Sequence, residues 1–350
     1  MPAIRVLVVE DSLTVRKRLV EVLTADPELE VVGEAEDGKA AIELCQRLRP
    51  DVVTLDMMLP VMTGLAATEF IMAYCPTPIL IVSASTNRGE LFRTYEALAA
   101  GAVDVFEKPS AIELDDGWDR TLVSTVKLVS RIKVITHPRG RLSGLRRAAA
   151  PAKAASSCRA VAIGASTGGP AALVEILKGM PSDYPLPILL VIHIASAFAA
   201  GFAEWLDGQS PLRVRYAQDG EPLPRRGEGR VIMAVPDRHM VIRNGRLWLT
   251  DDAERHSCRP SVDVLFESVA RELGAGAAAG LLTGMGKDGA AGLLAIRQAG
   301  GTTLAQDEAT SVVFGMPGEA IRLGAATRVL PLDQIAAALT AMGGVPEDKP

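Results

Sequence analysis

Three polar side chains between residues 166 and 288 of this sequence have the types that nucleophilic hydrolysis requires. The first is Ser166, in the segment VAIGASTGGP, where an apolar strand pattern leads into the glycine-framed sequence Gly164-x-Ser166-x-Gly168 and then into a helix start. A sharp turn of this kind exposes a serine hydroxyl and directs backbone N–H groups toward a developing oxyanion. The same letters are typical of a loop that binds phosphate. The segment alone therefore predicts either a nucleophile or an anion site.

His193 and Asp288 favour the nucleophile. His193 ends the apolar run PILLVIH, and Asp288 follows the apolar run AAGLLTGMG. Active crevices of open parallel sheets lie at the carboxyl ends of strands around a topological switch point, so we expect both side chains to meet Ser166 there. Serine would attack, histidine would take its proton, and aspartate would orient the imidazole and stabilise the imidazolium. The order Ser, His, Asp differs from the Ser, Asp, His order of α/β-hydrolases.

A second group of chemically active residues lies in the first third of the chain. Glu10 and Asp11 directly follow the first apolar run, and Asp56 ends the third. Carboxylates gathered at one sheet edge suit Mg²⁺, which offsets the repulsion of an incoming phosphoryl group. We therefore predict Glu10, Asp11 and Asp56 as metal ligands and Asp56 as the phosphoacceptor. Ser83, at the end of the fourth run, and Lys108, after the fifth, are predicted to contact the acyl phosphate.

Two series of alternating strand and helix patterns position these groups. From residue 4 to about residue 133, five short apolar runs alternate with amphipathic stretches, which is typical of strands with crossover helices. Residues 1–133 are therefore expected to form a doubly wound α/β domain of the (βα)5 type. Residues 134–157 are rich in Pro, Ala, Gly, Ser and basic residues and have no apolar period, so we predict a linker there.

The second series, over residues 158–342, predicts a doubly wound parallel-sheet hydrolase domain. Short β-like pieces interrupt it between Arg213 and Leu249, where Asn244-Gly245 is typical of a tight hairpin. We expect these pieces to form a short antiparallel insertion. Residues 343–350 have no core-facing pattern and are predicted to be a flexible tail.

Composition narrows the class of protein. A length of 350 residues predicts two domains, and a net charge of -5 with mixed signs argues against binding to nucleic acid or anionic lipid. No apolar run reaches the ~20 residues that span a bilayer, so we expect no membrane insertion. The four cysteines show no CxxC spacing, which favours reduced thiols and a cytoplasmic location.

The motifs resemble two known families. The order of acidic residues, Ser83 and Lys108 in the first half resembles the receiver domain of two-component response regulators. The second half resembles the catalytic domain of the chemotaxis protein-glutamate methylesterases, the CheB family, through GASTGGP, RPSVDVLF, TGMGKDGAAG and AQDEATSVVFGMPGEA. This resemblance implies Ser166 as nucleophile, His193 as general base and Asp288 as its orienting carboxylate. It also implies backbone oxyanion donors, for which Thr167 and Met285 are our candidates.

The same resemblance implies a function. The substrates would be glutamate methyl esters on methyl-accepting chemoreceptors, and receptor glutamines would be deamidated through a similar tetrahedral oxyanion. The phosphodonor of the receiver would be a histidine kinase of the chemotaxis type. Mg²⁺ would serve the receiver domain, and the hydrolytic step would need no cofactor.

Two departures from the family patterns leave alternatives open. Val105 stands where many receivers have an aromatic switch residue, and HIASAFAAGF follows in place of the common HMPPGFT-like segment at His193. One alternative is a catalytically weakened signalling adaptor, which a Ser166→Ala variant that still restores signalling would favour. The other is a dinucleotide-binding enzyme that uses the Gly-rich turn with Asp183 near the ribose, which nicotinamide titration would test.

Three residues near the motifs have competing interpretations. His256 in ERHSCRPSVD is an alternative base if His193 faces inward. Cys258 is a less suitable nucleophile than Ser166, which has the turn and the helix N-terminus that would activate it. The side chain of Met285 is expected to pack, so that only its amide would take part in chemistry.

Overall fold

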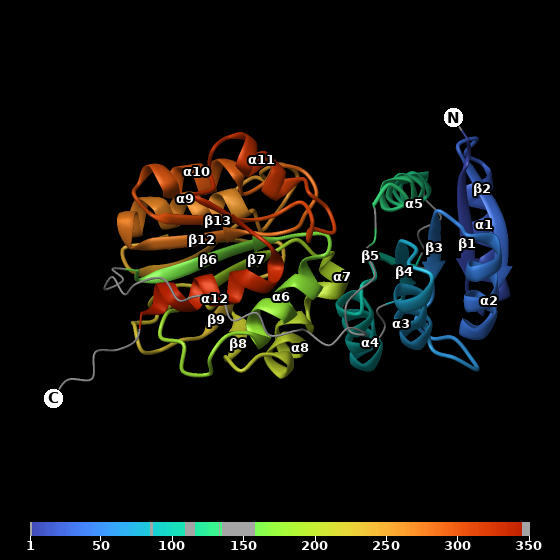
Figure 1. Cartoon of the computed structure of the whole chain (residues 1–350), viewed down its shortest axis with the longest axis horizontal. Coiled ribbons are helices and arrows are strands. Elements are labelled where there is room, and N and C mark those ends of the chain that lie inside the picture. The colour runs from blue at the N-terminus through green and yellow to red at the C-terminus, as the bar shows by residue number, and fades with distance from the viewer. Residues whose placement is uncertain (1, 85–86, 109–115, 133, 135–157, 345–350) are drawn as a thin grey trace. The chain divides into compact units, whose positions relative to one another are not determined.

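The computed structural model divides into two compact units, Met1–Leu145 and Arg146–Pro350 (Figure 1). It describes residues 2–84, 87–108, 116–132, 134 and 158–344. Except for residue 134, the predicted linker over 134–157 lies outside these residues, as do residues 345–350 of the predicted tail.

The first unit is a parallel sheet of strand order β2-β1-β3-β4-β5. The central strands carry continuous apolar runs because crossover helices bury both of their faces. The strands are β1 (Ile4–Val9), β2 (Leu29–Ala35), β3 (Val52–Leu55), β4 (Ile79–Ser83) and β5 (Asp104–Glu107), and the helices are α1 (Leu13–Thr24), α2 (Gly38–Leu48), α3 (Gly64–Tyr74), α4 (Arg88–Ala99) and α5 (Asp116–Val129). The strand order reverses between β1 and β3, so their carboxyl ends flank the switch point.

The second unit contains a seven-stranded parallel sheet of order β14-β13-β12-β6-β7-β9-β8. Its strands are β6 (Ala160–Ala165), β7 (Ile188–Ile192), β8 (Val214–Tyr216), β9 (Val231–Met233), β12 (Ala277–Leu281), β13 (Thr302–Gln306) and β14 (Arg328–Leu330). β6 lies between β7 and β12, and the chain leaves it first toward β7 and later toward β12. The end of β6 is therefore the switch point of this sheet.

Helices cover this sheet on both faces. Figure 1 shows α9, α10 and α11 together on one side of it and α6, α8 and α12 together on the other. The helices are α6 (Gly169–Lys178), α7 (Ser196–Ala199), α8 (Phe202–Gln209), α9 (Val262–Leu273), α10 (Ala290–Gln298), α11 (Met316–Arg322) and α12 (Leu332–Gly343), with a 3₁₀ turn η2 (Gly274–Gly276). Apolar residues of α9 such as Leu265, Phe266 and Val269 form one core with the sheet. None of the described helices has the length and apolar character needed to span a bilayer.

The predicted fold class is confirmed, with one correction to the insertion. β10 (His239–Arg243) and β11 (Arg246–Thr250) form the antiparallel hairpin, and Asn244 and Gly245 adopt φ of 53° and 67° in its turn. β8 and β9 were expected in the same antiparallel insertion, but they pair in parallel at the edge of the main sheet. Strands of three residues carry too little alternation to indicate which sheet they join.

Candidate active site

Ser166 and His193 follow neighbouring strands at the same level of the sheet. The last residues of β6 and β7, Ala165 and Ile192, are register partners, and the His193 N–H donates to the Ala165 carbonyl at 3.0 Å. On the other side, the Ser166 N–H donates to the carbonyl of Thr283, which follows β12, at 3.0 Å. Ser166 therefore lies at the switch point between the ends of β7 and β12.

The turn that carries Ser166 requires glycine at two close approaches. Gly168 has a φ of 77°, and a Cβ there would lie 2.5 Å from the Cβ of Val312. A Cβ on Gly284 would lie 2.7 Å from the Cβ of Ser166 itself. The Ser166 carbonyl accepts a hydrogen bond of 2.6 Å from the N–H of Gly169, the first residue of α6. The local sequence thus produces a tight strand-to-helix turn with the serine at its apex.

The imidazole of His193 is paired with Asp288. Nε2 of His193 lies 3.0 Å from Oδ2 of Asp288, whose residue is only 2% exposed. The Asp288 carboxylate accepts four further hydrogen bonds, most of them from the N-terminus of α9. These donors are Ser261 Oγ at 2.7 Å and the backbone N–H groups of Val262 at 2.7 Å, Asp263 at 3.0 Å and Gly289 at 3.1 Å. Asp288 is therefore fixed in position and held as an anion.

These contacts shift both titrations in the direction that stabilises an ion pair. Burial raises the pKa of Asp288, but hydrogen bonds from His193 and Ser261 outweigh it and hold that pKa below its ordinary value. Burial lowers the pKa of His193, but Asp288 and then Cys258 outweigh it and raise that pKa to about 9. The imidazolium is therefore strongly favoured, and the other ring nitrogen, Nδ1, lies 3.8 Å from the Sγ of Cys258.

The structure separates the competing candidates near this site. His256 Nε2 lies 3.2 Å from Oδ2 of Asp263, whereas His193 faces Asp288. His193 thus has Asp288 as its carboxylate partner, and His256 as the base stays an alternative prediction. The expectation that the Met285 side chain packs is wrong, since Met285 is 48% exposed between two glycines that permit a tight loop.

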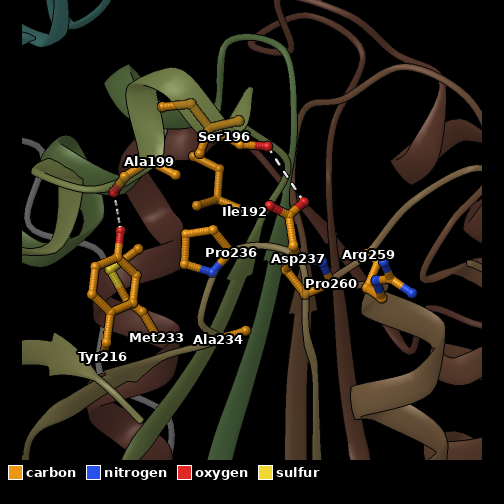
Figure 2. A pocket seen from close by; sticks show the side chains of 11 residues that line it. Ile192, Ser196, Ala199, Tyr216, Met233, Ala234, Pro236, Asp237, Arg259 and Pro260 are labelled. Atoms are coloured by element: carbon orange, nitrogen blue, oxygen red, sulfur yellow. Dashed lines mark hydrogen bonds between the residues drawn. The ribbon is translucent and has the colours of Figure 1, made fainter. Parts of the chain in front are cut away.

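A small pocket lies beside the active edge of the sheet. Figure 2 shows it with Ser196 hydrogen-bonded to Asp237, at 3.3 Å, and its cavity volume is about 20 Å³. Ile194, Ser196 and Ala199, which belong to the segment after His193, form part of its lining. The segment that departs from the family pattern therefore shapes the surface next to the candidate base.

The first unit brings the predicted acidic residues together. Glu10, Asp11 and Asp56 each place a carboxylate oxygen within 4.8 Å of the others. Lys108 Nζ lies 2.9 Å from Glu10 Oε2 and 3.0 Å from Asp56 Oδ2. Glu10 and Asp56 are buried and Asp11 is exposed, so the cluster has one open side.

The donor set fits a small divalent cation. Oδ1 of Asp56 is buried and has no hydrogen-bond partner among the described residues. Burial and then the charge of Asp56 raise the pKa of Glu10 to about 7, against the opposing effect of Lys108. A bound cation would offset both the unpartnered oxygen and the carboxylate repulsion, and oxygen ligands of this kind suit Mg²⁺.

Ser83 has a partner that the sequence did not indicate. Its hydroxyl donates to Oε1 of Glu90 at 2.8 Å, and Glu90 also accepts from the Ala84 N–H at 3.2 Å. Ser83 lies at the end of β4, as predicted, but its hydroxyl is engaged with α4. Contact with an acyl phosphate would require this bond to yield.

Comparison with known proteins identifies both units. Residues 161–339 match the family model of the CheB methylesterase, and residues 6–115 match that of the response regulator receiver domain. A protein-glutamate methylesterase/protein-glutamine glutaminase of Nitrosospira multiformis is 46% identical over 346 residues, covering 96% of each chain. The chain belongs to the CheB methylesterase family. A second relative of the same printed name, numbered 2, from Anaeromyxobacter dehalogenans, is 48% identical over 336 residues, again covering 96% of each chain.

A solved structure is similar to the second unit. The crystal structure of the Thermotoga maritima CheB methylesterase catalytic domain matches with a TM-score of 0.49 and 37% identity, covering 52% of this chain and 97% of that one. The resemblance that the sequence motifs indicated is confirmed by the family models and the near full-length relatives.

The sequence did not indicate the residues that hold the Ser166 turn in place. Thr283 Oγ1 donates to the carbonyl of Thr167 at 2.9 Å, and the Thr283 N–H donates to Oε1 of the buried Gln306 at 2.8 Å. Ser261 supports Asp288 and also caps α9 by accepting from the Val264 N–H. The cap could have been found, because a serine directly before an apolar helix pattern is a typical N-cap.

Proposed function

We propose that this chain hydrolyses glutamate methyl esters on methyl-accepting chemoreceptors and deamidates receptor glutamines, under the control of a phosphorylated receiver domain. The observation that carries the proposal is the contact of 3.0 Å between His193 Nε2 and Asp288 Oδ2 at the strand end next to Ser166. This contact occurs in a chain that is 46% identical to a protein named protein-glutamate methylesterase/protein-glutamine glutaminase.

In the first half of the reaction the enzyme is acylated. With the Nε2–H donating to Asp288, Nδ1 of His193 is the nitrogen that accepts the Ser166 proton as Oγ attacks the γ-carbonyl carbon. Asp288 stabilises the imidazolium that forms. The bond from carbon to the methoxy oxygen then breaks, and His193 gives its proton to the departing methanol. With glutamine as substrate the same proton goes to departing ammonia.

In the second half water releases the product. The imidazole takes a proton from water as it attacks the acyl carbonyl, and the proton then passes to Ser166 Oγ as glutamate leaves. No cofactor enters either half.

The backbone supports two oxyanion donors. The Ser166 carbonyl is bound by Gly169, so in the trans peptide the Thr167 N–H points the opposite way. Likewise the Gly284 carbonyl accepts from the Met316 N–H at 2.9 Å, which turns the Met285 N–H away from α11. A Cβ on Gly284 would lie 2.7 Å from the Cβ of Ser166, so both peptides lie close to the nucleophile, and we propose the N–H groups of Thr167 and Met285 as the donors to the tetrahedral oxygen.

The receiver site would accept a phosphoryl group on Asp56. Glu10, Asp11 and Asp56 would hold Mg²⁺, which would neutralise charge on the phosphoryl oxygens, and Lys108 would contact the acyl phosphate. We propose a histidine kinase of the chemotaxis type as phosphodonor. We propose the cytoplasm as the location, since all four cysteines are free.

The deciding experiment incubates the full-length protein with radiolabelled methylated receptor. We expect methanol release that rises when a small phosphodonor and Mg²⁺ are added. Ser166→Ala should abolish release without loss of folding, and a Ser196→Ala variant serves as a serine control outside the relay. Release that persists in Ser166→Ala would refute the assignment, and a Ser166→Ala protein that still restores signalling would favour the adaptor.

A further inference from the structure

The two ring nitrogens of His193 face different chemical groups. Nε2 lies 3.0 Å from Oδ2 of Asp288, and Nδ1 lies 3.8 Å from the Sγ of Cys258. His193, Cys258 and Asp288 each offer one atom within 4.8 Å of the others. This edge therefore combines an imidazole, a thiol and a carboxylate, which are the ligand types of transition-metal sites.

The separation of sulfur and nitrogen fits a shared cation. A tetrahedral Zn²⁺ with bonds of about 2.0–2.1 Å to nitrogen and about 2.3 Å to sulfur places these two atoms about 3.6 Å apart. The observed 3.8 Å needs only a small movement of one side chain. A histidine that binds a metal usually donates its other ring N–H to a carboxylate, and Asp288 already occupies that position.

A turn over residues 255–258 holds Cys258 next to His193, and the two central residues of this turn adopt an uncommon backbone conformation. Arg255 and Cys258 exchange two backbone hydrogen bonds, of 3.1 and 3.0 Å, around His256 and Ser257. His256 and Ser257 adopt φ of 54° and 58°, a region that residues other than glycine adopt uncommonly. The contact between His256 and Asp263 anchors the turn to α9. The fold therefore imposes the position of the thiol, as at sites where local strain serves a function.

We propose that a divalent cation of the Zn²⁺ class binds between the Cys258 thiolate and Nδ1 of His193, with water completing its coordination. Thiolate and imidazole select this class, whereas the carboxylate cluster of the receiver suits Mg²⁺. The cation occupies the Nδ1 lone pair, so His193 no longer accepts a proton from Ser166. This inhibitory consequence rests on the proposed hydrolase function, but the binding itself does not.

Binding is tested with Co²⁺ as a spectroscopic replacement for Zn²⁺. Full-length protein freed of metal by a chelator is titrated with Co²⁺, and we expect the near-ultraviolet absorption of a thiolate-to-Co²⁺ charge transfer. The absorption should vanish in Cys258→Ala and persist in Cys158→Ala, a matched change at another partly exposed cysteine of the same unit. Circular dichroism checks that both variants fold. No absorption in the wild type, or absorption that survives Cys258→Ala, overturns the proposal.

Inhibition is tested separately with methylated receptor and Zn²⁺, each variant being compared with its own metal-free rate. Cys258→Ala should raise the apparent inhibition constant for Zn²⁺ at least about 100-fold. Removing a residue that only hydrogen-bonds to a metal ligand lowers metal affinity by up to about 100-fold, so removing the ligand itself should lower it at least as much. Asp56→Asn should leave that constant unchanged. Inhibition that disappears in Asp56→Asn would assign the effect to the receiver and overturn the proposal. A protein that gives the Co²⁺ absorption but has no esterase activity would refute the proposed function alone.

Discussion

Replacing Asp288 by Asn should separate the orienting carboxylate from the rest of the site. The pKa of His193 is raised from 6.5 to about 9 by Asp288 and Cys258, which corresponds to about 3 kcal/mol of imidazolium stabilisation. Loss of the larger part of this stabilisation in the transition state lowers kcat about 100-fold. The Asn amide also donates toward Nε2, which moves the ring proton to Nδ1 and removes the lone pair that would accept the Ser166 proton. With the wrong tautomer included, we expect a loss of up to about 10⁴ in kcat.

The assay must distinguish this effect from unfolding. Asp288 accepts five hydrogen bonds, so Asp288→Asn leaves buried donors facing an amide and should cost roughly 3–5 kcal/mol of stability. Methanol release is therefore measured well below the melting temperature, after circular dichroism confirms folding. Ser166→Ala is the control, since it should abolish activity with little change in melting temperature. A folded Asp288→Asn protein that keeps activity within tenfold of the wild type would refute the reasoning.

Three further predictions follow from the same contacts. Because the base must be neutral, kcat/KM should rise with pH to a midpoint near 9, and Cys258→Ala should move that midpoint to lower pH; a flat profile from pH 6 to 10 would contradict this. Gly168→Ala places a Cβ at φ 77° and 2.5 Å from Val312 Cβ, so urea denaturation should show that the free energy of unfolding falls by about 2–5 kcal/mol. Gly208→Ala in α8 is the control, because a Cβ there meets nothing within 4 Å and the free energy of unfolding should not fall. Asp56→Asn should remove the increase in methanol release that a phosphodonor with Mg²⁺ produces, and a stimulation that persists would show that another group accepts the phosphoryl.

Much of the fold was predictable because strand ends carry the informative residues. Apolar runs ending in a polar residue indicated both Ser166 and His193, and parallel pairing of β6 with β7 then requires the two to lie at one edge. The chain order alone did not reveal that β8 and β9 extend the same sheet, since three residues give no usable period. The family and the fold class are confirmed, while the roles of the individual site residues remain predictions.

Contacts between distant segments could not be predicted from spacing. The approach of Cys258 to His193 spans 65 residues and depends on the turn at His256 and Ser257, whose positive φ no local pattern indicates. The hydrogen bond from Ser83 to Glu90 is also not predictable from spacing, because it depends on how α4 packs on the end of β4. Sequence patterns identify which elements meet, but the rotamers and turns that decide each contact come from packing.

Two aspartates of this chain show how hydrogen-bond donors assign different chemistry to one residue type. Asp56 and Asp288 both follow strands near a switch point, and both are 2% exposed. Asp56 has one carboxylate oxygen without a hydrogen-bond partner among the described residues, and the other pairs with Lys108, so this carboxylate keeps lone pairs for a cation and for a phosphoryl group. Asp288 accepts five hydrogen bonds, including one from His193, so its oxygens are committed to holding other groups. The number of donors around each carboxylate, more than its burial, therefore makes one a candidate phosphoacceptor and the other a support for a base.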